Sequence, residues 1–196
     1  SGTKAEIDAL SATLQAENVA YEVSVSDLGD NLVFFGNLAA NQYISVTDTV
    51  ANLTSGNALL ASSKSTTVTD SATVAQATTI AALSAIDDIT YSLTDTAANL
   101  DAGGAAAILG AGSSVTVTGT STLAQAGGIT AGAGAGATVT LAIADVDTNA
   151  AGIVAGARLN SASDITITGT VGITAAQATT LVNATNSGST SIALVT

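Results

Sequence analysis

The chain has 196 residues, enough for one domain with a sizeable core, and a formal net charge of −12. Only Lys4, Lys64 and Arg158 are basic, which excludes a surface that neutralises nucleic-acid phosphates and disfavours binding to anionic membranes. The chain has no Cys and no His, so disulfides, thiolate metal sites and histidine-based catalysis are excluded as well.

The first predicted element is a helix over residues 4–18, "KAEIDALSATLQAEN", which has an amphipathic pattern. It differs from everything that follows. Because repeat arrays need polar caps at their ends, we predict that residues 1–20 form an N-terminal helical cap and that residues 21–196 form a repeat domain. One uncharged stretch, Leu123 to Ala144, contains five Gly and is not apolar enough for a membrane span.

From Tyr21 onward the chain repeats a phrase in which apolar residues alternate with Thr or Ser and the run closes on Asp or Gly. These closing residues are spaced by 21 to 26 positions, which predicts seven coils, each made of one strand and one return segment. "SIALVT" at the end is the predicted opening strand of an eighth coil. The closing residues are Asp27, Asp48, Asp70, Asp95, Gly119, Asp145 and Gly169.

Two kinds of coil alternate from Asp48 onward, which gives a double repeat of about 49 residues. One kind reads Asp, three residues, Asn; the other carries the tripeptide Ala-Gln-Ala around Gln76, Gln125 and Gln177. The alternating runs predict strands with one buried face, and the Ala-rich segments that follow predict helical or coiled returns. Asp70 or Ser71 can start one such helix. Residues 130–137, "TAGAGAGA", are predicted to be irregular because Gly disfavours helix.

A unit of this length cannot bury its apolar face alone, and a strand followed by a return pairs in parallel with the next strand. The predicted fold is therefore a repeat solenoid of parallel β-strands with helical or coiled returns. In this arrangement Val117 faces the interior and Thr118 faces solvent.

The phrases "VTDTAANL" and "VTVTGTSTLAQA" resemble those of long bacterial extracellular β-strand repeat proteins, notably cyanobacterial ones. The resemblance covers Tyr21 to Thr196. It implies a surface-layer, adhesin or fibre-like protein at the cell surface or outside the cell. The Gly-Asp nonapeptide repeats that bind calcium in many such proteins are missing here.

Catalysis has little support in the sequence. The acidic pairs Asp87–Asp88 and Asp145–Asp147 are the nearest candidates for two-carboxylate hydrolysis of glycosides. Asp145 and Asp147 alternate at a predicted strand end and could share a face. The simpler interpretation is that these residues are solvated turn acids and helix caps, so we predict that the protein is not an enzyme.

A calcium site is the one metal site that the sequence leaves open, because Asp and Asn oxygens suit Ca²⁺. The competing interpretation is that each Asp caps the helix that follows it and each Asn satisfies loop backbone. The three Gln residues are predicted to face inward and to join neighbouring coils. No other cofactor is predicted. The calcium candidates are Asp27, Asn31, Asp48, Asn52, Asp95, Asn99, Asp145 and Asn149.

The outward hydroxyl residues of successive strands are predicted to form two ranks on a flat sheet. Such ranks resemble the Thr-x-Thr surfaces of ice-binding solenoids, although Thr also simply suits an exposed strand. Ser45, Thr47, Ser92, Thr94, Thr138 and Thr140 continue the same ranks. The binding-face candidates are Thr67, Thr69, Thr116, Thr118, Thr166 and Thr168.

The sequence thus predicts a non-enzymatic extracellular structural protein, a solenoid segment of a surface layer, fibre or adhesin. The alternative is a module that binds ice or carbohydrate through the Thr-rich face. Expected partners are copies of itself in an oligomer or a head-to-tail filament, or neighbouring repeats of a longer chain. No nucleic acid and no membrane span are expected.

Overall fold

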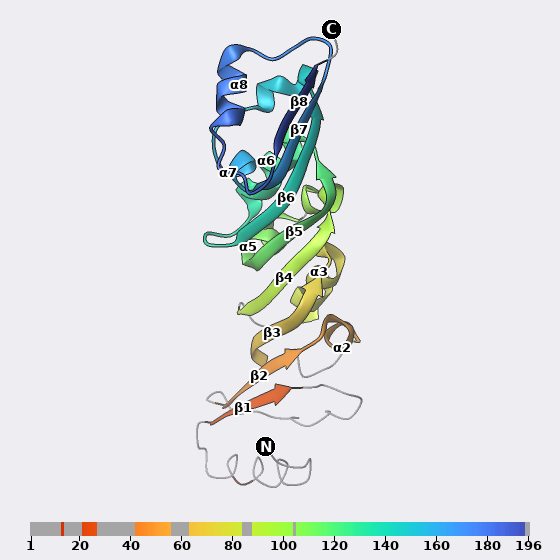
Figure 1. Ribbon diagram of the computed structural model, residues 1–196. Coiled ribbons are helices and arrows are strands. Elements are labelled where there is room, and N and C mark those ends of the chain that lie inside the picture. The colour runs from red at the N-terminus through yellow and green to blue at the C-terminus, as the bar shows by residue number, and fades with distance from the viewer. Residues whose placement is uncertain are drawn as a thin grey trace. The chain divides into compact units, whose positions relative to one another are not determined.

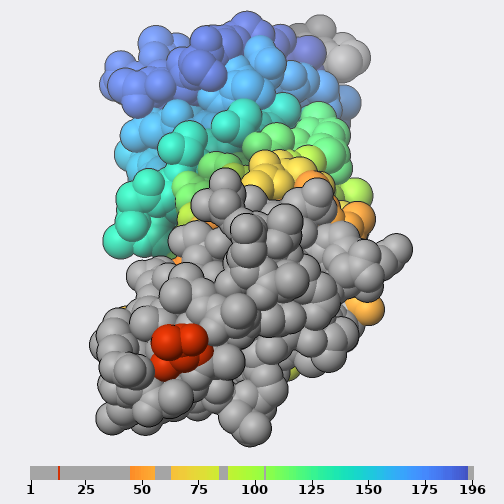
Figure 2. Space-filling view, turned by 90° about the horizontal axis from the view of Figure 1, so that it is seen from below, coloured from red at the N-terminus to blue at the C-terminus, as the bar shows by residue number. Residues whose placement is uncertain are grey.

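The computed structural model describes residue 13 and residues 21–26, 42–55, 63–83, 88–103 and 105–194, which are coloured in Figure 1. In the space-filling view of Figure 2, residues 21–26 and 42–44 are grey as well. The predicted helical cap over residues 1–20 lies outside the described residues, apart from Thr13. The chain divides into two compact units. Residues 1–71 and 75–91 form the first, and residues 72–74 and 92–196 form the second.

The first unit contains three strands in chain order, with short helices in the returns, by which we mean the segments between successive strands. β1 pairs in parallel with β2, and β2 with β3. One further strand, β4, spans the boundary between the two units in sequence. The elements are β1 (Tyr21–Ser26), β2 (Gln42–Asp48), α2 (Val50–Thr54), β3 (Ser63–Ala72), α3 (Val74–Leu83) and β4 (Ile89–Thr96).

The second unit continues in the same way, with each strand beside the next one in the chain. β5, β6, β7 and β8 pair in parallel, and Figure 1 shows helical segments between them. The expected parallel strands with helical returns are therefore confirmed, and the sheet is open. The elements are α4 (Ala97–Leu100), α5 (Ala106–Ala111), β5 (Gly112–Ser121), α6 (Leu123–Gly132), β6 (Thr138–Val146), η2 (Asp147–Gly152), α7 (Ala157–Asn160), β7 (Ala162–Gly169), α8 (Ala175–Val182) and β8 (Thr190–Leu194).

β5, β6 and β7 each bury residues on one face and expose residues on the other. Val117 is 7% exposed whereas Thr118 is exposed, as the alternation predicts. The buried strand residues pack with apolar residues of the helices such as Leu123 and Ile129, which are 1% and 0% exposed. Thr116 and Thr118, on the other face of β5, are exposed. None of the helices that the structure describes is long and apolar enough to cross a membrane.

The prediction of an irregular segment over residues 130–137 is wrong for its first three residues, because α6 continues to Gly132. A capping box fixes the start of this helix: Thr122 accepts the N–H of Gln125, and Gln125 accepts the N–H of Thr122. Burial of Ile129 then stabilises its last turns despite the Gly residues. Only residues 133–137 form the irregular connection to β6.

Gly127 and Gly128 stand where α3 and α8 have two Thr residues, and the structure gives a reason. A Cβ on Gly127 would lie 2.6 Å from the guanidinium of Arg158, and one on Gly128 would overlap the carboxylate of Asp101. Arg158 itself donates to the carbonyl oxygens of Leu123 and Gly152. The two Gly residues therefore allow side chains from the preceding and following returns to lie against α6.

The buried hydroxyl of Ser121 has no hydrogen-bond partner, which leads to a stability prediction. β5 and β3 have the same length and burial pattern, and the position of Ser121 in β5 is taken by Ala72 in β3. Ser121→Ala should raise the free energy of unfolding by about 1 kcal/mol, because an unsatisfied buried hydroxyl is removed.

Urea denaturation followed by circular dichroism would measure this change. Ser63→Ala is the matched control, since the Ser63 hydroxyl lies 3.1 Å from that of Thr66 in the buried part of β3. We expect this control to lower stability. A lower stability for Ser121→Ala would mean that the hydroxyl has a partner after all.

Candidate functional site

The Asp-x-x-x-Asn pairs form the most regular polar arrangement in the described residues. In three of them the Asn side-chain amide donates to Asp Oδ1, over 2.8 Å at Asp48, 2.8 Å at Asp95 and 2.7 Å at Asp145. The same Oδ1 accepts the next backbone N–H, from Thr49, Thr96 or Val146. The fourth pair, Asp27 and Asn31, lies outside the described residues.

A second contact extends from Asp70, Asp95 and Asp145 to the preceding return. Each carboxylate accepts the N–H of the first residue of a helix 20 to 22 residues earlier. The donors are Val50, Val74 and Leu123, at 2.6, 3.0 and 2.8 Å. We call these three contacts the downstream Asp caps. They satisfy helix N–H groups that have no partner inside the helix, and they place a negative charge at the positive end of the helix dipole.

The expectation that each Asp caps the following helix is therefore wrong in direction. Thr49 and Thr96 cap the helices that follow Asp48 and Asp95, because each accepts the N–H three residues later. Thr122 and Thr174 cap α6 and α8 in the same way. Asp70 does not start α3, because its carboxylate bonds Val50 N–H of α2. At Asp95, the hydroxyl of Thr96 caps the following helix while the Asp carboxylate bonds backward to Val74.

These contacts also bear on the calcium candidates. At Asp95 and Asp145 the carboxylate receives two backbone N–H groups and one amide, so the Asn presents its donor, not its oxygen, to the Asp. A cation would have to displace these donors. Within the described parts of the chain, no three acidic side chains gather around a common point that could hold a metal.

The hydrogen bonds shift the pKa of two of these aspartates. For Asp95, burial alone would raise the pKa above 3.8, but donors from Asn99, Thr96 and Val74 lower it below that value. For Asp145, burial again acts upward, and the donors Asn149, Leu123 and Val146 outweigh it, so the pKa is lowered. Both residues are therefore held as carboxylates.

Acid should destabilise the fold through these groups. A carboxyl group whose pKa is lower in the folded than in the unfolded chain stabilises the fold above the unfolded value of 3.8. That contribution is lost as the pH falls through the lower folded value. We expect the melting temperature to drop steeply below about pH 4.

An Asp95→Asn/Asp145→Asn double variant is the comparison for this pH dependence. Its melting temperature should be lower than that of the wild type at pH 7. The difference between the two melting temperatures should shrink toward pH 2, where both chains carry uncharged side chains at these positions. A constant gap between pH 7 and pH 2 would contradict the prediction. Calorimetry at a series of pH values measures both curves.

Asp145 and Asp147, one of the two acidic pairs considered for catalysis, bond to different partners. Asp145 bonds backward to Leu123, whereas Asp147 is buried and accepts the N–H groups of Val171 and Gly172, 24 and 25 residues later. Asp88 is exposed, and Asp87 lies outside the described residues. Asp145 and Asp147 thus hold different parts of the backbone.

The Gln residues follow the sequence prediction in part. Gln177 donates to the carbonyl of Ala150, 27 residues earlier, so it does join neighbouring returns. Gln125 and Gln177 also close capping boxes with Thr122 and Thr174. The Thr-x-x-Gln spacing is the sequence signal for that second role, which the prediction of inward-facing Gln side chains missed.

The Thr-rich face is exposed, but its ranks are interrupted. Thr47 registers with Thr67, and Thr116 with Thr140. The next pair of strands differs, because Thr166 and Thr168 register with Ala144 and Val146 and not with Thr138 and Thr140. This strand pair also has a one-residue register shift between Leu141 and Ile143. The expectation of two continuous hydroxyl ranks across all strands is therefore wrong at β6 and β7.

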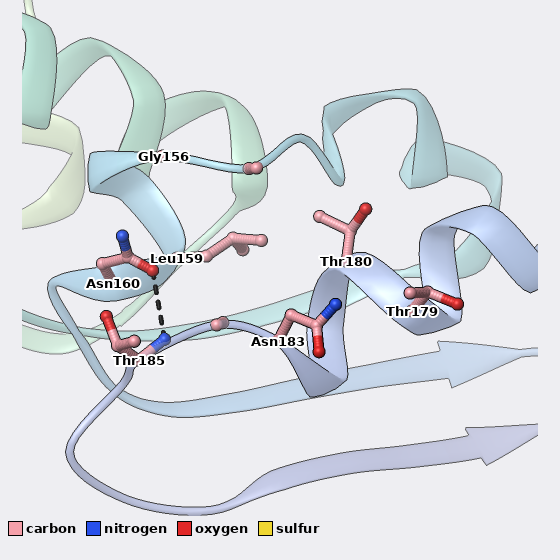
Figure 3. A pocket seen from close by; sticks show the side chains of 9 residues that line it. Gly156, Leu159, Asn160, Thr179, Thr180, Asn183 and Thr185 are labelled. Carbon is pink, nitrogen blue, oxygen red and sulfur yellow. Dashed lines mark hydrogen bonds between the residues drawn. The ribbon is translucent and has the colours of Figure 1, made fainter.

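A small cavity lies between α7 and α8 (Figure 3). Its volume of about 230 Å³ is below the roughly 300–1,000 Å³ of small-molecule sites. The hydroxyls of Thr179 and Thr180 donate to carbonyls of their own helix, and Asn160 accepts the N–H of Thr185. The cavity is lined by Ala155, Gly156, Leu159, Asn160, Thr179, Thr180, Asn183, Ala184 and Thr185, none of which is charged.

Comparison with models of known families, with curated proteins and with solved structures found no match. The function is therefore inferred from this chain's own residues. The functional contacts that sequence reasoning missed are the backward direction of the Asp side chains and the anchoring of Arg158 on α6. The sequence signal for the Arg158 contact was the pair Gly127-Gly128, which stands in α6 where α3 and α8 have two Thr residues.

Proposed function

We propose that this chain is a non-enzymatic extracellular structural protein, a solenoid segment of a surface layer, fibre or adhesin. The observation that carries the proposal is the order of the strands in each unit, where every strand pairs in parallel with its neighbour in the chain. In ordinary α/β proteins a parallel sheet is covered on both faces. Here Thr116 and Thr118 remain exposed, as in a solenoid whose returns lie on one side.

The downstream Asp caps support the same proposal. They recur at equivalent positions, and each one links a strand end to the previous return. The polar side chains that could perform chemistry, Asp145 and Asp147, are engaged by backbone donors. These contacts hold coil to coil, which is what an extracellular segment under mechanical load requires.

The deciding experiment removes whole coils. Deleting residues 96–145 joins Asp95 to Val146 and preserves the Asp-x-x-x-Asn spacing through Asn149. In a solenoid the coils on either side of the deletion should stack on each other, because each coil contacts only its neighbours. We expect cooperative unfolding and the same circular dichroism per residue as in the full chain.

The matched control deletes residues 96–132. It joins Asp95 of β4 directly to the irregular connection, residues 133–137, that leads into β6. This variant should not unfold cooperatively. If the in-phase deletion is as disrupted as the control, the protein is not a solenoid. Antibody labelling of intact cells, before and after surface proteolysis, tests the proposed location, since an intracellular chain would not be labelled.

The exposed hydroxyl face supports the alternative function, binding of ice or carbohydrate. Ice recognition requires a regular lattice, and the offset of Thr166 against Ala144 breaks that lattice. We therefore expect no thermal hysteresis from the purified chain. A clear hysteresis gap, lost in Thr116→Lys, would favour the alternative over the structural role.

A further inference from the structure

The chain contains two copies of the motif Asn-x-Ser/Thr, the acceptor sequence for N-linked glycans. One covers residues 52–54, Asn-Leu-Thr, and the other covers residues 183–185, Asn-Ala-Thr. So short a motif indicates a glycan only where the folded chain presents the asparagine on an exposed segment outside regular structure. The two copies differ in this respect.

The first motif is built into the fold. Asn52 belongs to α2, and its side-chain amide donates to Asp48 over 2.8 Å. The Thr54 hydroxyl donates to the carbonyl of Val50 over 2.8 Å, and Leu53 between the two is fully buried. The amide and the hydroxyl of this motif are thus both used inside the fold. A transferase could reach Asn52 only by unfolding α2.

The second motif lies where α8 ends. Asn183 is exposed and directly follows the last residue of the helix, and residues 184–189 belong to no helix or strand (Figure 3). The side-chain amide of Asn183 makes no hydrogen bond to the described residues. Thr185 is exposed as well, and it bonds Asn160 through its backbone N–H and not through its hydroxyl. Both groups of this motif are therefore accessible in the folded chain.

Asn183 is exposed because of its place in the coil, and not because few residues follow it. The capping boxes of α6 and α8 align the two helices, so Asn183 corresponds to Ala131. Ala131 is exposed although a further return and the strand β7 follow it. In α3 the same position is Ala82, which is exposed too. The end of this helix faces solvent in each Ala-Gln-Ala coil.

From these observations we infer that Asn183, and not Asn52, carries an N-linked glycan. The inference rests on the proposed extracellular function, since the donor is an oligosaccharide that a diphosphate links to a membrane lipid. A bond forms between Asn183 Nδ2 and C1 of the first sugar, and the C1–O bond to the diphosphate breaks. The lipid diphosphate leaves with that electron pair, and the amide proton passes to a base of the transferase.

A glycan at this position also suits the composition around it. Residues 165–194 contain no charged side chain, in a chain whose net charge is −12. A bulky, hydrated glycan on Asn183 therefore adds solvation to the part of the chain that has no charge of its own. It stands at the end of a return, away from the exposed hydroxyls of Thr116 and Thr118 on β5.

Mass spectrometry of the protein purified from its own cells tests the inference. Cleavage before Asp places the two motifs in separate fragments, one starting at Asp48 and the other at Asp164. We expect the added mass of a glycan on the fragment that starts at Asp164, and complete loss of that mass in Asn183→Gln. Thr185→Ser should keep the glycan and Thr185→Ala should lose it, although both variants retain Asn183.

Three results would overturn the inference. They are an unmodified Asn183 in chains that antibody labels at the cell surface, a glycan on Asn52, and a glycan that persists in Thr185→Ala. The first result would leave the proposed function standing, because the surface labelling that tests that function is carried out on the same cells. A chain that is neither labelled nor modified would overturn both.

Discussion

Replacing Val117 by Asp should strongly destabilise the second unit. Val117 lies inside β5, with 7% of its surface exposed, between the buried residues Val115 and Ser121. An unpaired carboxylate there costs about 3–5 kcal/mol, which is a large part of the roughly 5–15 kcal/mol that stabilises a typical domain. Urea titration followed by circular dichroism should show the loss as a transition at much lower denaturant.

Thr118→Asp is the matched control, one residue further along the same strand. Its side chain is exposed, so the same charge should change the free energy of unfolding by less than about 0.5 kcal/mol. Equal transitions for the two variants would mean that the buried and exposed faces of β5 are assigned the wrong way round.

The second large effect is expected for Asp145→Ala. This change removes the carboxylate that accepts three hydrogen bonds, from Leu123 N–H, Val146 N–H and the Asn149 side-chain amide. Hydrogen bonds to a charged group contribute about 1.5–3 kcal/mol each, but one carboxylate shared among three donors gives less than their sum. We expect a loss of about 3 kcal/mol in the free energy of unfolding.

Calorimetry at pH 7 measures this loss, and Asp88→Ala provides the control, because Asp88 is exposed. Asn149→Ala removes only the amide donor and should cost less than Asp145→Ala. The double variant Asp145→Ala/Asn149→Ala should lose no more free energy of unfolding than Asp145→Ala alone. That result would confirm that Asn149 acts through the Asp145 carboxylate. If Asp145→Ala melts like Asp88→Ala, the downstream Asp caps do not stabilise the fold.

The strand positions could be predicted because period-two alternation is plain in the sequence. Val115 and Val117 against Thr116 and Thr118 identify both the strand and its buried face. Parallel pairing followed from the return segments, since a strand followed by a crossover meets its neighbour in the same direction. The recurrence of Asp48, Asp95 and Asp145, each followed by Asn four residues later, was also visible in the sequence.

The direction of those Asp side chains could not be predicted, because a capping residue is ordinarily assigned to the helix next in sequence. Here the donor is 20 to 22 residues earlier, and only the packing of successive strands brings the two together. The register irregularity between β5 and β6 could not be predicted either. Gly119 has φ +78° within an irregular stretch between Thr116 and Thr120, and no periodicity in the sequence marks such a shift.

The downstream Asp caps also have a consequence for synthesis of the chain. The carboxylate that completes α6 is made 22 residues after Leu123, and the same holds for α2 and Asp70 after 20 residues. At roughly 5–20 residues per second, each helix start waits about 1–4 s for its cap. A growing chain therefore carries α2, α3 or α6 without its Asp cap until the strand with the matching Asp has been made. Structure is completed from the N-terminus toward the C-terminus, one return at a time.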